Sequence, residues 1–259
     1  MPVKKNFISI LITNFNKEKY ILKTLKSVIS QNFKNYEIIL FDDNSTDRSI
    51  KIIQEFKRIK LIKNDSKSKK TPALNQLNGI LKVFNKAKGN IICLMDSDDI
   101  FKKKKLSRIN NFFKRNKLKK FVVNYPDTNF QLKLKRIKVN NNIWPSIFPT
   151  SCISFERSFF LKFKKFSKKN DFSNLEIDAR LAIFAYHYYD DFNILNEKLT
   201  TYLRDDQGIS SKYKRFSIMW WKKRYEAFCY LKYILNLKNK KIKIGIDYII
   251  TQIIYFLIR

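Results

Sequence analysis

The sequence predicts an α/β fold with a mostly parallel sheet and helices on both of its faces. Two observations support this prediction. Short apolar runs alternate with longer segments of helical periodicity through the first half of the chain, which is the order of repeated strand–helix units. Polar and acidic residues follow three of these runs directly, and open α/β sheets build their ligand sites at the carboxyl ends of strands.

Five strands are expected at short, mainly apolar runs that polar residues bound: 7–13, 36–41, 60–63, 91–95 and 121–125. The first is the continuous apolar run FISILIT, which Asn14 and Asn16 bring to an end. A run of this kind is typical of a strand that is buried on both faces. A loop rich in lysine and serine is expected at 64–71.

Helices are expected where apolar residues recur every three or four positions: 17–31, 48–57, 72–89, 102–116, 175–189 and 214–236. Ser45, Thr46 and Asp47 are suitable N-cap residues for the second of these helices. Pro72 suits the first position of the third helix, and Gly89 is expected to end it.

The regular alternation fades after about residue 126. Residues 131–140 alternate apolar and basic side chains, as an edge strand does. Residues 143–160 mix prolines with apolar side chains, which indicates a loop, then a strand and then a turn. We expect one large domain at 1–211 and a helical extension at 212–259.

Composition limits the chemistry that the chain can perform. The three cysteines, Cys93, Cys152 and Cys229, lack the spacing of metal ligands and are typical of reduced thiols in a cytosolic protein. His187 is the one histidine, which argues against zinc sites and against nucleophiles that histidine activates. We therefore expect carboxylates to carry the chemistry.

The net charge of +32 comes from 54 basic and 22 acidic residues and has two explanations. One is attraction to a polyanion, such as nucleic acid, anionic lipid or a phosphorylated substrate. The other is a compositional bias toward Lys, Asn, Ile and Phe. The lysines are spread along the chain and no nucleic-acid-binding motif is evident, so no specific nucleic-acid partner is expected.

Three acids stand together after the apolar run 91–95: Asp96, Asp98 and Asp99. Clustered carboxylates repel one another unless a cation neutralises them. Oxygen ligands at this density suit a hard divalent ion, Mg²⁺ or Mn²⁺. A solvated turn is the alternative interpretation, although a buried strand before the acids makes it weaker.

As an ordered set, the motifs resemble those of the family 2 glycosyltransferases with the GT-A fold. The set consists of Thr-Asn-Phe-Asn from Thr13, Asp-Asp-Asn-Ser-Thr-Asp from Asp42, Ala73-Leu74-Asn75, Ala87-Lys88-Gly89, and Asp-Ser-Asp-Asp from Asp96. The likeness is close over residues 7–115 and weaker from Thr150 to about Ser211. It implies a nucleotide-sugar-binding half at 1–115 and an acceptor half at 116–211.

The resemblance implies a nucleotide-sugar donor, most often a UDP-sugar, and a Mn²⁺ or Mg²⁺ cofactor. Asp43 matches the carboxylate that hydrogen-bonds the base, and Asp98 matches the metal ligand, with Asp96 beside the ribose or the metal. Leu74 stands where many members have arginine, so Lys69 and Lys70 in the preceding loop are candidate partners of the diphosphate, with ordinary surface lysines as the alternative interpretation. The implied donor-binding residues are Thr13, Asn16, Asp42, Asp43, Lys70, Asp96 and Ser97.

Sugar transfer also needs a base for the acceptor hydroxyl. By resemblance that base is Asp178, with Glu176 as the second candidate. An acid at the head of a helix can also serve only as a cap, and this interpretation stays open. Thr150–Cys152 matches an acceptor-side loop or a plain turn. The resemblance implies inversion of the anomeric centre, and the absence of a Gln-X-X-Arg-Trp signature favours addition of a single sugar.

The implied function is metal-dependent transfer of a sugar to a hydroxyl of a glycan or lipid-linked acceptor, in the assembly of surface polysaccharide or lipopolysaccharide. Two alternatives stay open. One is a catalytically inactive, transferase-like binding protein, and the other is a basic nucleic-acid-binding protein.

The start of the chain lacks the apolar core of a signal peptide, so a cytoplasmic location is expected. Residues 242–259 are apolar but are interrupted by Asp247 and Gln252, and they fall short of the roughly 20 residues that span a bilayer. A packed helix is one interpretation. The other is a helix lying in an anionic membrane interface, at the inner face of the plasma membrane.

Overall fold

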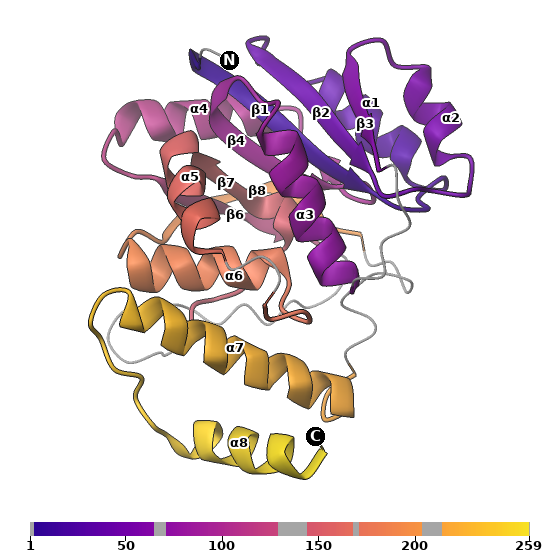
Figure 1. Cartoon of the computed structure of the whole chain (residues 1–259). Helices are drawn as coiled ribbons and strands as arrows, with labels where there is room; N and C mark the ends of the chain where they lie inside the picture. Colours follow the sequence, from indigo (N-terminus) through magenta and orange to yellow (C-terminus); the bar gives the residue numbers. More distant parts are fainter. Residues whose placement is uncertain (1–2, 65–70, 129–143, 168–170, 204–213, 259) are drawn as a thin grey trace.

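The computed structural model describes residues 3–64, 71–128, 144–167, 171–203 and 214–258, and Figure 1 shows a sheet with helices packed on it. The strands are β1 Lys4–Asn14, β2 Tyr36–Asp42, β3 Ile59–Lys63, β4 Gly89–Asp96, β5 Ile100–Phe101, β6 Phe121–Asp127, β7 Ile153–Glu156 and β8 Asn193–Thr201. The helices are α1 Ile21–Ile29, α2 Ser49–Gln54, α3 Pro72–Phe84, α4 Lys105–Arg115, α5 Arg157–Phe166, α6 Ile177–Ile183, α7 Ile218–Asn236 and α8 Ile246–Ile258. Two short turns of helix complete them, η1 Thr150–Cys152 and η2 Phe184–Tyr188.

The described strands form one sheet in the order β3-β2-β1-β4-β7-β6-β8-β5. Strands β3, β2, β1 and β4 are parallel, and β6 is parallel to β8, whereas β7 runs antiparallel to both β4 and β6. The predicted mostly parallel sheet is therefore confirmed. Its register sets Thr13 of β1 between Phe41 of β2 and Asp96 of β4, so three predicted polar strand ends share one edge.

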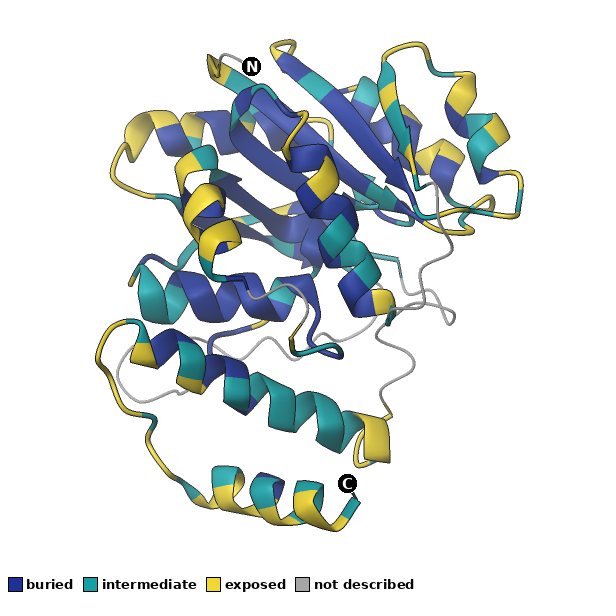
Figure 2. Ribbon diagram, in the orientation of Figure 1, coloured by how far each residue is buried: buried dark blue, intermediate teal, exposed yellow. Residues whose placement is uncertain are grey.

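Alternate residues of the central strands build two separate cores. Ile8, Ile10 and Ile12 of β1 pack with apolar side chains of α1, α2 and α4. Leu11 faces the other way and packs in the larger core with α3, α5 and α6. This period of two is the geometry of a strand whose two faces are both covered, and the dark central strands of Figure 2 show that burial.

Two element predictions need correction. Helix α3 ends at Phe84, and Gly89 begins β4 instead of ending the helix. A Cβ on Gly89 would lie 2.6 Å from the backbone oxygen of Phe7, so this glycine is required by the close approach of β1. The turn expected before residue 160 is wrong as well, because α5 begins at Arg157.

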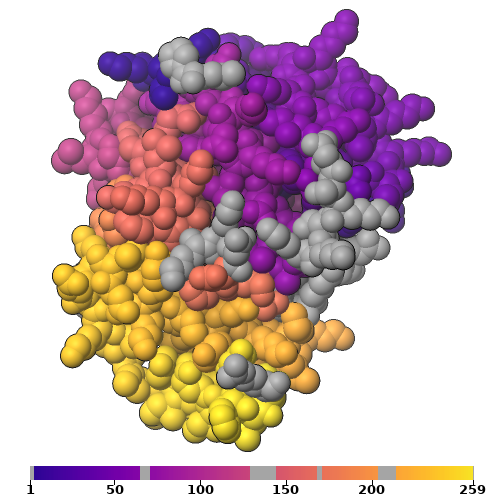
Figure 3. All heavy atoms as spheres, viewed as in Figure 1, coloured from indigo at the N-terminus to yellow at the C-terminus, as the bar shows by residue number. Residues whose placement is uncertain are grey.

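The helical extension divides at the end of α7. Tyr230, Leu231, Ile234 and Leu235 of α7 are buried in the larger core, so α7 is an integral layer of the fold. By contrast, Thr251 is the one buried residue of α8. Figure 3 shows these two helices forming one end of the molecule, opposite the N-terminal strands.

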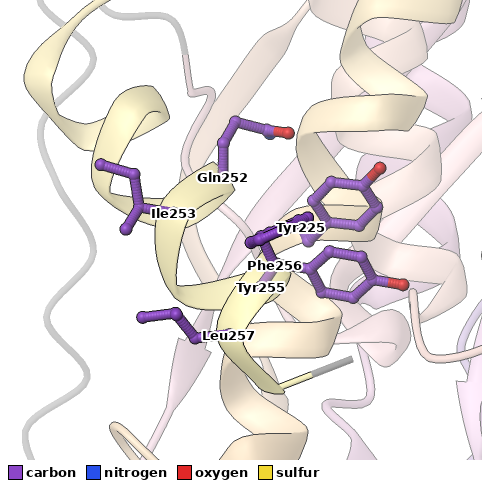
Figure 4. A pocket seen from close by; sticks show the side chains of 6 residues that line it. All are labelled: Tyr225, Gln252, Ile253, Tyr255, Phe256 and Leu257. Atoms are coloured by element: carbon purple, nitrogen blue, oxygen red, sulfur yellow. The ribbon is translucent and has the colours of Figure 1, made fainter.

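Aromatic and polar contacts hold α8 against α7. The Tyr225 and Tyr255 rings stack with their centroids 3.6 Å apart, and Arg224 binds both Asp247 and Thr251. A pocket of about 440 Å³ lies beside the stacked rings, lined also by Gln252, Ile253, Phe256 and Leu257 (Figure 4). Among the described residues, no helix is long and apolar enough to cross a bilayer.

Candidate active site

Asp42, at the end of β2, is fully buried and organises the loop that follows it. One carboxylate oxygen accepts hydrogen bonds from Asn14 Nδ2 at 2.7 Å and from Ser45 Oγ at 2.6 Å. The other oxygen accepts from the Ser45 backbone N–H at 2.9 Å. Hydrogen bonds to the ionised form offset the cost of burying its charge. Asp42 is thus placed to shape the site, with both oxygens engaged by the protein.

Asn16 ties the loop after β1 to the loop after β2. It has a left-handed backbone with φ of 50°, which asparagine tolerates better than most residues. Its side-chain oxygen accepts from the Thr46 N–H at 2.8 Å, and its own N–H donates to Ser45 Oγ at 2.9 Å. These contacts fix the loop that leads away from Thr13, which is itself partly exposed at the sheet edge.

Asp43 lies one residue beyond the sheet and is partly exposed. Its Oδ1 accepts from Asn64 Nδ2 at 2.8 Å, and Asn75 of α3 provides a second side-chain hydrogen bond. Burial raises the pKa of Asp43, while these two amides lower it. The Asp43 side chain therefore lies between β2 and α3 with part of its surface open to solvent.

The acids after β4 occupy different environments. Asp98 pairs with Lys17, whose Nζ lies 2.6 Å from Asp98 Oδ2. Asp96 accepts a hydrogen bond from Gln76 Nε2 of α3 at 2.7 Å. Asp99 is buried and accepts from the Leu203 N–H at 3.0 Å. The inward position of Asp99 does not suit direct contact with a ligand.

Ser97 and Ser151 hold this turn in place. The buried Ser97 turns its carbonyl oxygen to Thr24 Oγ1 of α1 at 2.9 Å. Ser151 of η1 accepts from the Asp96 N–H at 2.9 Å and also hydrogen-bonds the Asp99 carboxyl group. Thr150–Cys152, expected to be either an acceptor-side loop or a plain turn, is a short buried turn whose Ser151 contacts Asp96 and Asp99.

The candidate base stands at the head of α6. Glu176 precedes the helix and pairs with Lys223 of α7, and the Asp178 carboxylate accepts from the Ala179 N–H at 2.6 Å. Burial and the neighbouring Glu176 charge raise the pKa of Asp178 to about 7, although Lys223 opposes the shift. A carboxyl group with this pKa exchanges protons readily near neutral pH.

The candidate base on α6 lies near the acids at the end of β4. The pKa of Asp96 is raised to about 7 by burial, then by the charge of Asp98, then by that of Asp178. Asp178 from α6 is therefore close enough to the end of β4 for its charge to be felt there. Strongly shifted carboxyl groups gathered at a sheet edge are typical of an active site.

The sequence model of glycosyl transferase family 2 matches residues 9–173, which is more than half of the chain. The chain belongs to this family. The match includes the ends of β1, β2 and β4, and it stops just before the Glu176–Asp178 segment.

Curated relatives of this family 2 member match its N-terminal part. The UDP-Glc:alpha-D-GlcNAc-diphosphoundecaprenol beta-1,3-glucosyltransferase WfaP of Escherichia coli is 38% identical over 113 residues, covering 43% of each chain. An uncharacterized glycosyltransferase of Haemophilus influenzae is 36% identical over 115 residues, covering 43% of this chain and 44% of its own. The matched segments thus span less than half the length of these relatives.

Solved structures extend the likeness to nearly the whole chain. Staphylococcus aureus TarS in complex with UDP-GlcNAc superimposes with a TM-score of 0.68 at 16% identity, over 96% of this chain and 70% of that one. A mannosyltransferase of Pyrobaculum calidifontis, solved with GDP-Man and Mn²⁺, gives a TM-score of 0.59 at 14% identity, over 96% and 69%. At this identity the likeness establishes the fold, and it confirms the expected GT-A architecture.

The carboxylates at the end of β4 suit a divalent ion whose remaining coordination positions are filled by a bound phosphorylated ligand and water. Among the described residues, no three His, Cys, Asp or Glu side chains gather so as to enclose a metal by themselves. Mg²⁺ and Mn²⁺ sites for phosphorylated substrates commonly use one or two carboxylates and complete their shell with phosphate oxygens and water. Asp96 and Asp98 supply hard oxygen donors of that kind in this family 2 member.

Several residues at the site escaped sequence analysis. Lys105 of α4 is fully buried, and its Nζ donates to Asn124 Oδ1, the Ser151 carbonyl and Thr200 Oγ1 at 2.8, 2.5 and 2.8 Å. Nothing in a lysine-rich segment distinguishes this lysine from its solvated neighbours. Lys17 and Lys223 were missed for the same reason, and Gln76 is one of several polar residues on α3 that the sequence does not distinguish. The predicted Lys70 lies outside the described residues.

Proposed function

We propose that this chain is a glycosyltransferase that moves a sugar from a nucleotide-sugar donor to a hydroxyl of a glycan or lipid-linked acceptor. The observation that carries the proposal is the convergence of Asp96 and Asp98 with Asp178 at one edge of the sheet. Family membership supports the reaction class. Such a transfer needs carboxylates on the donor side and a carboxylate base for the acceptor hydroxyl. Asp96 and Asp98 would serve the first need, and Asp178 the second.

The donor is proposed to bind across the ends of β1, β2 and β4, with Asp43 accepting a hydrogen bond from the base and Thr13 beside it. Asp42 and Asn16 would act by holding the loops, because their polar atoms already bond to Asn14, Ser45 and Thr46. A UDP-sugar is favoured, since WfaP is named for a UDP-Glc donor and TarS was solved in complex with UDP-GlcNAc.

Asp98 and Asp96 would hold the Mn²⁺ or Mg²⁺ ion, with Ser97 keeping the turn between them. When bound, that ion would neutralise the charge that develops on the leaving diphosphate. The Gln76 amide orients Asp96 from the α3 side, and Ser151 fixes its backbone. These contacts keep the donor carboxylates in place before the donor arrives, which lowers the reorganisation needed for reaction.

Asp178 is proposed to remove the proton of the acceptor hydroxyl as the oxygen attacks the anomeric carbon. Its pKa of about 7 is close to the optimum for a general base at neutral pH. Glu176 is the weaker candidate, because it already pairs with Lys223. A base on the face opposite the leaving diphosphate gives inversion, and a single addition is favoured over polymerisation.

The end of the molecule formed by α7 and α8 is proposed to lie on an anionic membrane. This placement agrees with a role in surface-glycan assembly at the inner face of the plasma membrane. Helix α8 turns an apolar face outward that includes Ile246, Phe256 and Leu257, at 77, 80 and 74% exposure (Figure 2). The segment before it carries four exposed lysines: Lys238, Lys240, Lys241 and Lys243. Apolar contact combined with positive charge favours an anionic lipid surface.

Co-sedimentation with phosphatidylcholine vesicles, with and without phosphatidylserine, tests this contact. Phe256→Asp should lose most of the binding to the anionic vesicles. Leu118→Asp is the matched control, because Leu118 is 90% exposed in the α4–β6 connection. Equal binding by both variants and the unchanged chain would exclude α8 as the contact.

The main proposal is tested by a thermal-shift panel of nucleotide sugars with and without Mn²⁺. We expect stabilisation by at least one UDP-sugar, larger with Mn²⁺, and slow release of UDP when donor alone is supplied. Stabilisation without any turnover on glycan or lipid-linked acceptors would favour an inactive binding protein. No stabilisation, together with salt-sensitive binding of random DNA, would replace the proposal by the nucleic-acid alternative.

A further inference from the structure

Lys17 forms a partly desolvated ion pair with the candidate metal ligand. Its Nζ lies 2.6 Å from Asp98 Oδ2, and the two side chains retain only 15 and 13% of their exposure. A short, charge-assisted contact that is shielded from water is stronger than the usual surface pair. One of the two carboxylate oxygens of Asp98 is thus already occupied by an ammonium group of the chain itself.

The backbone around Lys17 is fixed independently of that ion pair. The Lys17 N–H donates to Ser49 Oγ at 2.9 Å, and its carbonyl accepts from the N–H groups of Tyr20 and Ile21, each at 2.9 Å, just where α1 begins. The Tyr20 ring also lies 5.9 Å from the ammonium. The loop after β1 therefore holds the lysine stem in position beside the acids that follow β4.

The acids around Asp98 explain why a cation is needed there. Asp96 and Asp99 flank it in sequence, and the charge of Asp178 also reaches this turn. Without a positive charge, these carboxylates would repel one another in a site partly closed to water. An ammonium group can meet this need while the donor is absent, but it binds oxygens only by donating hydrogen bonds and offers no coordination positions, which a divalent ion would supply.

We propose that Lys17 is a resident counter-ion of Asp98 which a divalent metal must displace, so that the metal binds tightly only together with the donor. The proposal rests on the assignment of Asp98 as a metal ligand in the proposed function. A nucleoside diphosphate offers oxygens both to the incoming ion and to the released ammonium. Donor and metal then promote the binding of each other, and by linkage the effect is equal in both directions.

The test is a titration of the full-length chain with Mn²⁺, followed by the electron paramagnetic resonance signal of the free ion. Without nucleotide, Lys17→Met should bind Mn²⁺ about tenfold more tightly than the unchanged chain, because no ammonium competes for Asp98. With UDP present, the difference should shrink, since the diphosphate helps to displace Lys17. Lys19→Met is the matched control, because Lys19 is an exposed lysine of the same loop, and it should leave Mn²⁺ affinity unchanged.

Equal Mn²⁺ affinity of Lys17→Met and the unchanged chain without nucleotide would overturn the proposal. So would loss of UDP binding in Lys17→Met at all Mn²⁺ concentrations, because Lys17 would then itself be the cation that holds the donor. Lys17→Gln repeats the measurement with a polar side chain if the methionine variant is poorly folded.

Asp98→Asn separates this inference from the proposed function. Loss of Mn²⁺ binding in Asp98→Asn, combined with no effect of Lys17→Met, would contradict the counter-ion proposal and leave the proposed function standing. Unchanged Mn²⁺ binding in Asp98→Asn, with UDP present, would instead remove Asp98 from the metal site. That result would overturn both the counter-ion proposal and the metal assignment in the proposed function.

Discussion

The ends of β2 and β4 carry similar acidic sequences but are built in opposite ways. At the end of β2, the fully buried Asp42 has both oxygens satisfied by neutral donors from Asn14 and Ser45. At the end of β4, Asp96 is crowded by Asp98 and Asp178, and its pKa rises to about 7. A buried carboxylate that neutral donors satisfy is held rigidly. A carboxyl group buried beside other acids is stabilised only by binding a proton or a cation. The first arrangement suits a scaffold and the second suits chemistry.

Replacing the candidate base should give the largest effect at the β4 side. Asp178→Asn keeps the shape of the side chain but cannot accept a proton, and general bases contribute roughly 10²- to 10⁴-fold to rate. We therefore expect UDP release in the presence of acceptor to fall by about 10³-fold, with donor-induced thermal stabilisation retained. Asp190→Asn makes the same change at an exposed surface position and should retain full turnover. Comparable losses in both variants would contradict the assignment.

The same variant should be more stable than the unchanged chain at high pH. Because the pKa of Asp178 is raised in the folded state, that state binds the proton more tightly than the unfolded chain does. The free energy of unfolding therefore falls as pH rises from about 4 toward about 7, and asparagine escapes this loss. At pH 8 we expect Asp178→Asn to gain about 1–2 kcal/mol, or roughly 2–8 °C in Tm, and to gain little near pH 4. A Tm difference that does not depend on pH would contradict this expectation.

Much of the proposed donor side, at the ends of β1, β2 and β4, could be predicted from sequence because its signals are local. Continuous apolar runs mark β1, β2 and β4 as buried strands, and acids that follow such strands must meet at the carboxyl edge of a parallel sheet. The difference between Asp42 and Asp96 could not be predicted. It depends on Asn14, Gln76 and Asp178, which chain folding brings from other elements.

The second half of the chain, the proposed acceptor side, was harder to predict, for physical reasons that particular residues illustrate. Helix α5 is only ten residues long and buries three phenylalanines, Phe159, Phe160 and Phe163, so its apolar run resembles a strand and turn as much as a helix. Lys105 looks like a surface lysine in sequence, yet it is buried by oxygens from β6, η1 and β8. Partners that are distant in the chain, and not local periodicity, decide both cases.

The β2 side can be tested by its stability. Asp42→Asn replaces an acceptor of three hydrogen bonds with an amide whose NH₂ group would face the Asn14 amide or the Ser45 N–H. Leaving a buried donor without an acceptor costs about 1–3 kcal/mol, so the midpoint of urea unfolding should fall accordingly. Asp43→Asn, one residue on and partly exposed, should leave that midpoint nearly unchanged. A midpoint that Asp42→Asn leaves unchanged would mean that the loop does not depend on this carboxylate.

Asp43→Asn should show the smallest effect, and it should appear in binding. The Asp43 carboxylate already accepts hydrogen bonds from Asn64 and Asn75, so an amide of the same shape can keep part of this network and preserve the fold. An amide can still accept from the N–H of a uracil base through its oxygen, but it loses the charge that strengthens such a bond. We expect the KM for the UDP-sugar to rise by about tenfold while kcat stays within about twofold, since the base lies away from the reacting bond. A fall in kcat with unchanged KM would instead place Asp43 with Asp96 and Asp178 among the residues that act on the transition state, and the contrast between the two strand ends would no longer hold.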